Sequence, residues 1–188
     1  KSILPITKNK RKNYLLSVGR LTKQKNQILL IKSFNLFLKH HPNYKLIFIG
    51  HGPDKLKLMS LTKKLNLENK IIFKNWMSNP KEYYKHSKLF LFPSLYEGLP
   101  NALIDAVNYN LPSVSSDCSG ASDILTYNYK NIVKKLEPKI FSQKILDSIN
   151  NYQESLRSNK KIRSRLSNFL IYPQVNKYLD FCQLILNK

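Results

Sequence analysis

Two carboxylates flank a Gly-Leu-Pro-Asn turn in the stretch SLYEGLPNALIDA, residues 94–106, in a chain that holds only 11 acidic residues. Glu97 precedes the turn, and Asp105 follows after seven intervening residues, where the sequence becomes helical in character. Asn101 is the expected N-cap of this helix, whose first N–H groups would favour an anion. A carboxylate accepts two hydrogen bonds from vicinal hydroxyls, so the arrangement suits a sugar phosphate. By spacing alone, a loop acid beside an acid that stabilises the helix dipole is equally well supported.

Two cations follow the first expected strand, in SVGRLTKQKNQ, residues 17–27. Gly19 permits a turn, and Arg20 and Lys25 stand on either side of a short loop that opens a helix. Two fixed cations beside free helix-terminal N–H groups can bind a doubly charged phosphate. Because the chain has 32 basic residues, solvated loop cations are the alternative interpretation.

Two further glycine turns follow expected strands. IGHGPDK, residues 49–55, contains Gly50, and SSDCSGASDIL, residues 115–125, contains Gly120 among small neighbours. At both places the backbone can pass close to a neighbouring segment or to a ligand. An ordinary turn from strand to helix is the alternative for the second stretch.

The sequence lacks the motifs of several other chemistries. The full G-x-G-x-x-G pattern is absent after the first two expected strands, which disfavours a nicotinamide-dependent dehydrogenase. There is no Walker motif and no G-x-S-x-G nucleophile elbow. The four histidines and two cysteines show no metal-ligand spacing, and the cysteines form no disulfide framework. We therefore expect neither a metal nor a cofactor.

A formal net charge of +21 needs an interpretation. Basic surfaces bind nucleic-acid phosphates without sequence preference, but no nucleic-acid recognition module is visible. Attraction to an anionic membrane is a second interpretation, and the basic stretch 157–165 is the candidate docking helix. Compositional drift is the third, because Asn, Ile and Tyr are abundant beside Lys.

Short apolar runs alternate with helical stretches along most of the chain. The expected strands are 14–19, 44–50, 70–73, 88–92, 112–116 and 131–133. The expected helices are 26–40, 54–66, 79–87, 101–110, 140–152, 157–170 and 173–188. Strands this apolar, each followed by a helix, indicate a parallel sheet that is covered on both faces. The fold class is therefore α/β, a doubly wound, Rossmann-like sheet whose ligands bind beyond the carboxyl ends of the strands.

Four stretches, taken in order, resemble the donor-binding half of family-four retaining glycosyltransferases, which have the GT-B fold. They are GRLTKQKNQILLIKSF, IGHGPDKLK, FLFPSLYEGLPNALIDA and LPSVSSDCSGASDIL. The strongest motif is the pair of acids around E-G-x-P. The resemblance covers residues 13–188, which leaves 1–12 as a linker into the domain.

The resemblance implies a role for each matching residue. Arg20 and Lys25, with Gly19, would bind the nucleotide diphosphate, and Glu97 would contact the donor sugar. Asp105 would bind the ribose hydroxyls. The segment that would hold sugar and diphosphate through its backbone is Gly98, Leu99, Pro100, Asn101 and Ala102. Gly50 would line the same site, and the base would lie against residues 73–76, with Trp76 as the candidate contact. Glu97, Arg20 and Lys25 are the expected catalytic residues.

Two positions depart from the family pattern. Asp105 is one methylene shorter than the Glu usual at the ribose position, and Asn26 replaces a common Gly. Asn also tolerates the left-handed conformation, so the second departure should matter less.

The resemblance covers one of the two GT-B domains. We expect the acceptor-binding N-terminal domain to be absent and the carboxyl end, with its helix at 178–188, to be complete. The implied activity is retaining transfer of a sugar from a UDP-hexose or UDP-N-acetylhexosamine to a glycan or lipid-linked acceptor, without a metal. The implied process is polysaccharide or lipopolysaccharide synthesis. The expected location is the cytoplasm or the inner face of the membrane.

Two alternatives stay open at this point. The chain could be a non-catalytic remnant that still binds a nucleotide sugar, an alternative that the short acid at position 105 supports. It could instead be a basic α/β module for nucleic acid or membrane, although no specific nucleic-acid partner is expected.

Overall fold

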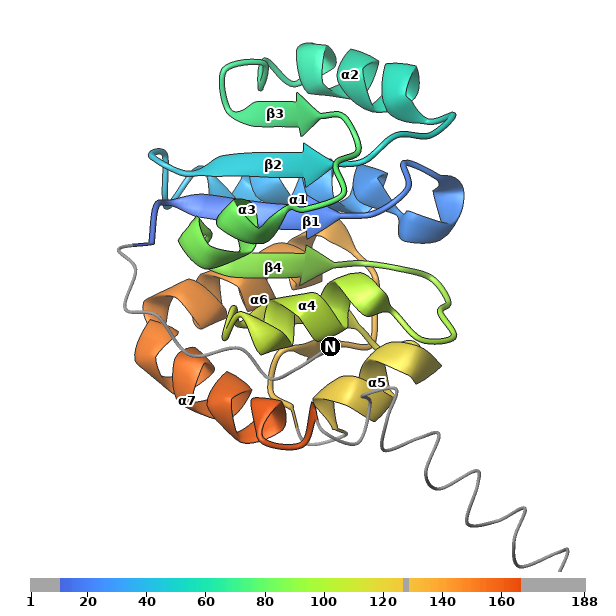
Figure 1. Cartoon of the computed structure of the whole chain (residues 1–188). Helices are drawn as coiled ribbons and strands as arrows, with labels where there is room; N and C mark the ends of the chain where they lie inside the picture. The colour runs from blue at the N-terminus through green and yellow to red at the C-terminus, as the bar shows by residue number, and fades with distance from the viewer. Residues whose placement is uncertain (1–10, 127–128, 167–188) are drawn as a thin grey trace, which may run out of the picture.

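The structure, a computed structural model, describes residues 11–126 and 129–166. A parallel sheet of six strands in the order β3-β2-β1-β4-β5-β6 forms its centre (Figure 1). The strands are β1 (Tyr14–Val18), β2 (Lys45–Ile49), β3 (Ile71–Lys74), β4 (Leu89–Phe92), β5 (Ser113–Ser116) and β6 (Ile132–Val133). The helices are η1 (Lys23–Lys25), α1 (Gln27–Phe37), α2 (Lys55–Lys64), α3 (Lys81–His86), α4 (Asn101–Asn108), α5 (Ser119–Leu125), α6 (Pro138–Asn150) and α7 (Tyr152–Arg163).

Helices cover both faces of the sheet. One apolar cluster joins α1, α2 and α6 to one face, and a second joins α3, α4, α5 and α7 to the other (Figure 1). Neighbouring strand residues divide between the two clusters: Leu15 belongs to the first and Leu16 to the second. Both side chains are fully buried, which is why the strands are apolar without alternation. The predicted doubly wound α/β class is confirmed.

Several boundaries differ from the prediction. The 3-10 turn η1 precedes the helix expected over 26–40, and Asn26 adopts a left-handed conformation with φ of 50°, so α1 begins only at Gln27 and ends at Phe37. Helix α5, of which Gly120 is the second residue, is not among the expected helices, although a turn from strand to helix was the alternative for this stretch. The helix expected over 173–188 lies outside the described residues.

Helix α7 is less uniformly exposed than the proposed membrane-docking stretch 157–165 requires. Arg163 is buried, and its Nε donates to the carbonyl of Asn108 at 2.8 Å. It therefore braces α4 against α7, which corrects its assignment to a basic surface. In the described part of the chain, no helix is long and apolar enough to cross a membrane.

Arg11 ties the end of the expected linker to the domain. Its Nη1 donates to the carbonyls of Tyr84 and Ser87 at 3.1 and 2.6 Å. Its Nη2 donates to those of Tyr109 and Asn110 at 3.1 and 3.0 Å. One guanidinium group thus satisfies carbonyls at the carboxyl ends of α3 and α4, where a cation is favourable.

The strand order reverses beside β1. The chain runs outward from β1 to β2 and β3, and then returns to place β4 on the other side of β1. The loops that follow β1 and β4 therefore leave the same edge of the sheet in different directions. A crevice at such a switch point is where open α/β sheets bind their ligands.

Candidate functional site

Lys25 and Glu97 meet across the switch point. Lys25 Nζ donates to Glu97 Oε1 at 2.5 Å, and the two side chains are 17% and 9% exposed. Lys25 comes from the loop after β1 and Glu97 from the loop after β4. The ammonium group also lies 5.4 Å from the ring centroid of Phe92. The fold therefore brings the basic loop after β1 against the acidic loop after β4. The family resemblance predicted that these two loops belong to one site.

The loop that carries Glu97 is fixed by its backbone. The N–H of Leu95 donates to the carbonyl of Gln24 at 2.8 Å, and Gln24 Nε2 donates to the carbonyl of Tyr96 at 2.9 Å. From the other side, Ser119 Oγ donates to the carbonyl of Glu97 at 3.2 Å. Gln24 and Ser119 thus position Glu97. Sequence reasoning missed Gln24, since a glutamine in a basic loop carries no signal of this contact.

Gly120 permits the close approach of two backbone segments in this region. A Cβ at Gly120 would overlap the carbonyl group of Gly98 and lie 3.0 Å from Pro100 Cδ. The sequence left open whether a ligand or a neighbouring segment approaches this glycine, and the structure places the backbone of the Glu97 loop there. Gly50 is similar, because a Cβ there would overlap the carbonyl of Gly19. Both glycines bring strand-end loops together and so shape the site indirectly.

The amino end of α4 opens at the same edge. Pro100 is the N-cap and Asn101 the first helical residue, so the expected cap at Asn101 was wrong by one position. Pro has no N–H to leave unpaired, and its carbonyl accepts from the N–H groups of Leu103 and Ile104 at 2.9 and 3.2 Å. Within the described residues, the N–H groups of Asn101 and Ala102 have no acceptor. They remain available to an anion.

Asp105 lies one turn into α4, partly exposed. Burial raises the pKa of Tyr84 well above its usual range, and the negative charge of Asp105 raises it further. The same charge adds to the effect of burial in raising the pKa of Tyr109. The charge of Asp105 therefore acts on both tyrosines. Its assignment to the ribose stays a prediction.

Replacing Asp105 by Glu restores the longer acid and should keep or raise UDP affinity, by up to about threefold. The added methylene lets the carboxylate reach the vicinal hydroxyls with less adjustment. Calorimetric titration of the two proteins with UDP checks this. A large loss of affinity would show that the ribose role is misassigned.

The remaining predicted residues lie around this edge. Arg20 is exposed in the loop after β1, and its carbonyl accepts from Gln27 Nε2 at 2.7 Å. Leu99 is 54% exposed in the loop after β4. Trp76 is 65% exposed in the loop after β3, and β2 and β1 separate its strand from β4. The structure does not bring Trp76 to the Lys25–Glu97 pair.

The described part of the chain contains no group of three or more His, Cys, Asp or Glu residues that could hold a metal ion. The polar groups that the structure places at the switch point are instead the Lys25–Glu97 pair and the open end of α4, with Arg20 exposed in the same loop as Lys25. Fold and site together define a Rossmann-like α/β domain with a polar ligand site at its switch point. The chain belongs to the glycosyl transferases group 1 family, whose family profile matches residues 3–165.

Relatives by sequence are glycosyltransferases that are much longer than the matched segment. A glycosyltransferase of Methanocaldococcus jannaschii is 47% identical over 111 residues, covering 58% of this chain and 27% of the relative. A diphospho-undecaprenol 4-alpha-N-acetylgalactosaminyltransferase of Campylobacter jejuni is 37% identical over 112 residues, covering 59% and 30%. The chain thus matches less than a third of each of these two relatives.

Solved structures with the same fold are GT-B glycosyltransferases. The pneumococcal O-GlcNAc transferase GtfA, solved with UDP and GlcNAc, superposes with a TM-score of 0.83 at 18% identity, covering all of this chain and 38% of that one. Anabaena HepE, solved with UDP, gives a TM-score of 0.80 at 17% identity, covering 92% and 49%. At these identities the likeness establishes the fold alone: this chain has a Rossmann-like fold that matches part of each of these GT-B glycosyltransferases.

Proposed function

We propose that this chain is the donor-binding domain of a retaining glycosyltransferase, and that the site between β1 and β4 binds a nucleoside diphosphate sugar. The observation that carries the proposal is the contact of Lys25 with Glu97 beside the open end of α4. A diphosphate needs cations and N–H donors, and a sugar needs a carboxylate acceptor. This edge of the sheet supplies all three.

Each group would act on a different part of the donor. Lys25, Arg20 and the N–H groups of Asn101 and Ala102 would stabilise the charge that develops on the leaving diphosphate. Glu97 would hold hydroxyls of the transferred sugar. These positive groups do the work that a divalent metal does in other transferases, so the proposed reaction requires no metal.

The retaining course follows from the family resemblance. The acceptor hydroxyl would attack the anomeric carbon on the face that the diphosphate leaves. The C–O bond to the diphosphate breaks as the bond to the acceptor oxygen forms. The acceptor proton passes to the departing phosphate oxygen, so this chain has to supply charge stabilisation rather than a general base.

We further propose that the donor is a UDP-hexose or UDP-N-acetylhexosamine and that the acceptor is a glycan or lipid-linked sugar. The Campylobacter relative is named for transfer of N-acetylgalactosamine to a diphospho-undecaprenol acceptor, and both structural neighbours were solved with UDP. In GT-B enzymes the acceptor is held by the other domain, so this chain alone should bind donor and transfer sugar poorly.

Glu97→Gln tests the sugar contact. It should weaken UDP-sugar binding about tenfold and change UDP binding by less than about threefold, because the lost carboxylate acts on the sugar. Titration calorimetry with UDP and with UDP-N-acetylglucosamine gives both constants. Glu82→Gln, a change of an exposed acid on α3, is the matched control. Equal losses for UDP and the UDP-sugar would argue against the contact.

A further inference from the structure

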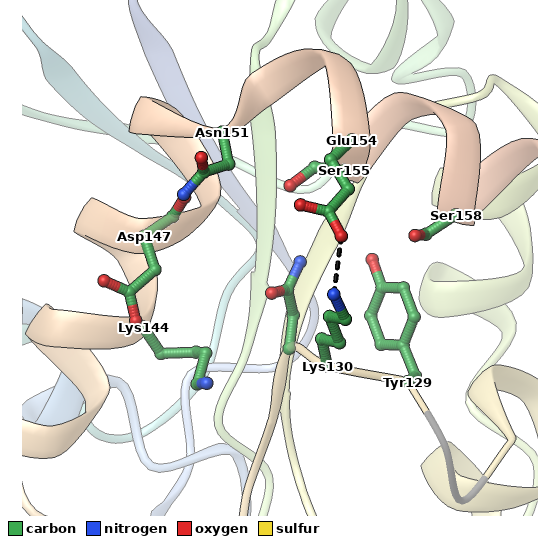
Figure 2. A pocket seen from close by; sticks show the side chains of 9 residues that line it. Tyr129, Lys130, Lys144, Asp147, Asn151, Glu154, Ser155 and Ser158 are labelled. Carbon is green, nitrogen blue, oxygen red and sulfur yellow. Dashed lines mark hydrogen bonds and ion pairs between the residues drawn. The ribbon is translucent and has the colours of Figure 1, made fainter.

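A polar pocket lies at the amino edge of the sheet, opposite the donor site. Its volume is about 270 Å³, and it opens between the second half of α6, the start of α7 and residues 129–131 before β6. Lys144, Asp147 and Asn151 line one side, and Glu154, Ser155 and Ser158 line the other, with Lys130 and Tyr129 between them (Figure 2). Nothing in the proposed donor chemistry uses these residues.

The pocket is electrically neutral within a strongly basic chain. Its two lysines, Lys130 and Lys144, balance its two acids, Asp147 and Glu154. Lys130 Nζ donates to Glu154 Oε1 at 2.6 Å, and Asp147 Oδ1 accepts from Gln143 at 2.9 Å. The rest of the lining is amide and hydroxyl. Mixed donors and acceptors without net charge suit a hydroxyl-rich, uncharged ligand.

Some of these groups have spare hydrogen-bonding capacity. A carboxylate accepts about four hydrogen bonds, and Asp147 uses one in the described structure. Lys144 Nζ and Ser158 Oγ have no partner among the described residues. A carboxylate and an ammonium group on one side of the pocket, with a hydroxyl on the other, can bind hydroxyls of one sugar ring.

A second pocket of about 300 Å³ adjoins the first. The two share Tyr129, Lys130 and Ser158, and the second adds Lys161 and Arg165. Both added cations are exposed, and none of the described residues that line this second pocket is acidic. We call the two adjoining pockets together the amino-edge groove, which is neutral in one half and cationic in the other.

We infer that the amino-edge groove binds an anionic glycan. An uncharged sugar unit occupies the neutral half, and the acid group of the adjacent unit lies against Lys161 and Arg165. A nucleic acid fits less well, because its regularly spaced phosphates would meet Asp147 and Glu154 in the neutral half. The neutral half is slightly smaller than the usual ~300–1,000 Å³ ligand pocket, which suits one or two sugar rings.

The test uses the full 188-residue chain and a hyaluronan hexasaccharide, in which N-acetylglucosamine alternates with glucuronate. Calorimetry should give saturable binding, stronger than that of chitohexaose, which lacks the acid groups. Asp147→Ala should weaken binding about tenfold, through loss of the carboxylate. Non-specific attraction predicts the opposite, because this change makes the chain more positive. Ser158→Trp, which fills the junction of the two halves, should weaken binding at least as much.

A charge-matched pair locates the cationic half. Lys161→Ala with Arg165→Ala should lower hexasaccharide affinity at least about tenfold. Lys57→Ala with Lys63→Ala removes the same charge from exposed positions on α2. This control pair should change hexasaccharide affinity by less than about twofold. Lys25→Ala should leave hexasaccharide binding intact, so failure of the donor-site proposal would not affect this one. Equal losses in the two charge-matched pairs, or unchanged binding in Asp147→Ala and Ser158→Trp, would overturn the inference.

Discussion

Replacement of both Arg20 and Lys25 by alanine is expected to lower UDP affinity at least about a hundredfold. Each charge-assisted hydrogen bond to a phosphate contributes about 1.5–3 kcal/mol, and two of them account for that factor or more. Lys25 also holds Glu97, which is 9% exposed, so its loss leaves a carboxylate without its cation. Titration calorimetry measures the affinity, and circular dichroism shows whether the fold is kept.

The matched control removes the same charge nearby. Lys23 lies in the same loop and Lys32 on α1, and both are exposed. Lys23→Ala with Lys32→Ala should reduce UDP affinity by less than about threefold, because exposed charges at a distance are screened by salt. Similar losses in the two double variants would mean that general basicity, rather than a built phosphate site, attracts UDP.

The second large effect concerns stability. Arg11→Met should lower the free energy of unfolding by about 3 kcal/mol, which corresponds to a fall in Tm of roughly 6–12 °C for a chain of this size. The change leaves four carbonyls, those of Tyr84, Ser87, Tyr109 and Asn110, without their shared donor. Burial lowers the pKa of the Arg11 guanidinium, as expected for a cation that the domain partly encloses.

Lys12→Met is the control for Arg11→Met. Lys12 is exposed and contributes its backbone N–H to the carbonyl of His86, a bond that the substitution keeps. Its effect should be below about 0.5 kcal/mol. Thermal unfolding of both variants gives the comparison. A Tm for Arg11→Met within a degree or two of the wild type would show that solvent replaces the guanidinium at little cost.

Arg11 and Arg163 also fix the helix that opens toward the proposed donor site. Both donate to carbonyls at the carboxyl end of α4 or in the turn after it, at Asn108, Tyr109 and Asn110. Cations at this end complement the helix dipole, while the other end of α4 opens toward the proposed diphosphate. Arg11 and Arg163 therefore fix the carboxyl end of α4, while its amino end is the proposed diphosphate site.

Periodicity and composition were enough to predict the fold class. Runs such as YLLSV and KLIFI are apolar at every position that the sheet buries except Ser17, and each leads into a helix. The parallel architecture can therefore be predicted from local sequence. Boundaries were less accurate where one residue decides them. The left-handed turn at Asn26 delays α1, and Pro100 displaces Asn101 from the cap.

The parts of the site that lie within one motif were predictable, and the contacts between motifs were not. Lys25 and Glu97 were each identified, but their ion pair spans 72 positions and depends on β1 and β4 being neighbours. Gln24 and Gly120 act on the backbone of the Glu97 loop, which no spacing rule reveals. Arg163 was predicted to be part of a basic surface, because the sequence does not distinguish one buried arginine from the exposed basic residues of the same helix.

The most direct test of the central claim is amide chemical-shift mapping of this chain during titration with UDP. The account predicts saturable shifts at Gly19, Lys25, Gly98, Asn101 and Ala102, which lie in the loops after β1 and β4 and at the start of α4. No shift at millimolar UDP would contradict the account. So would shifts confined to exposed lysines that DNA displaces with a steep salt dependence.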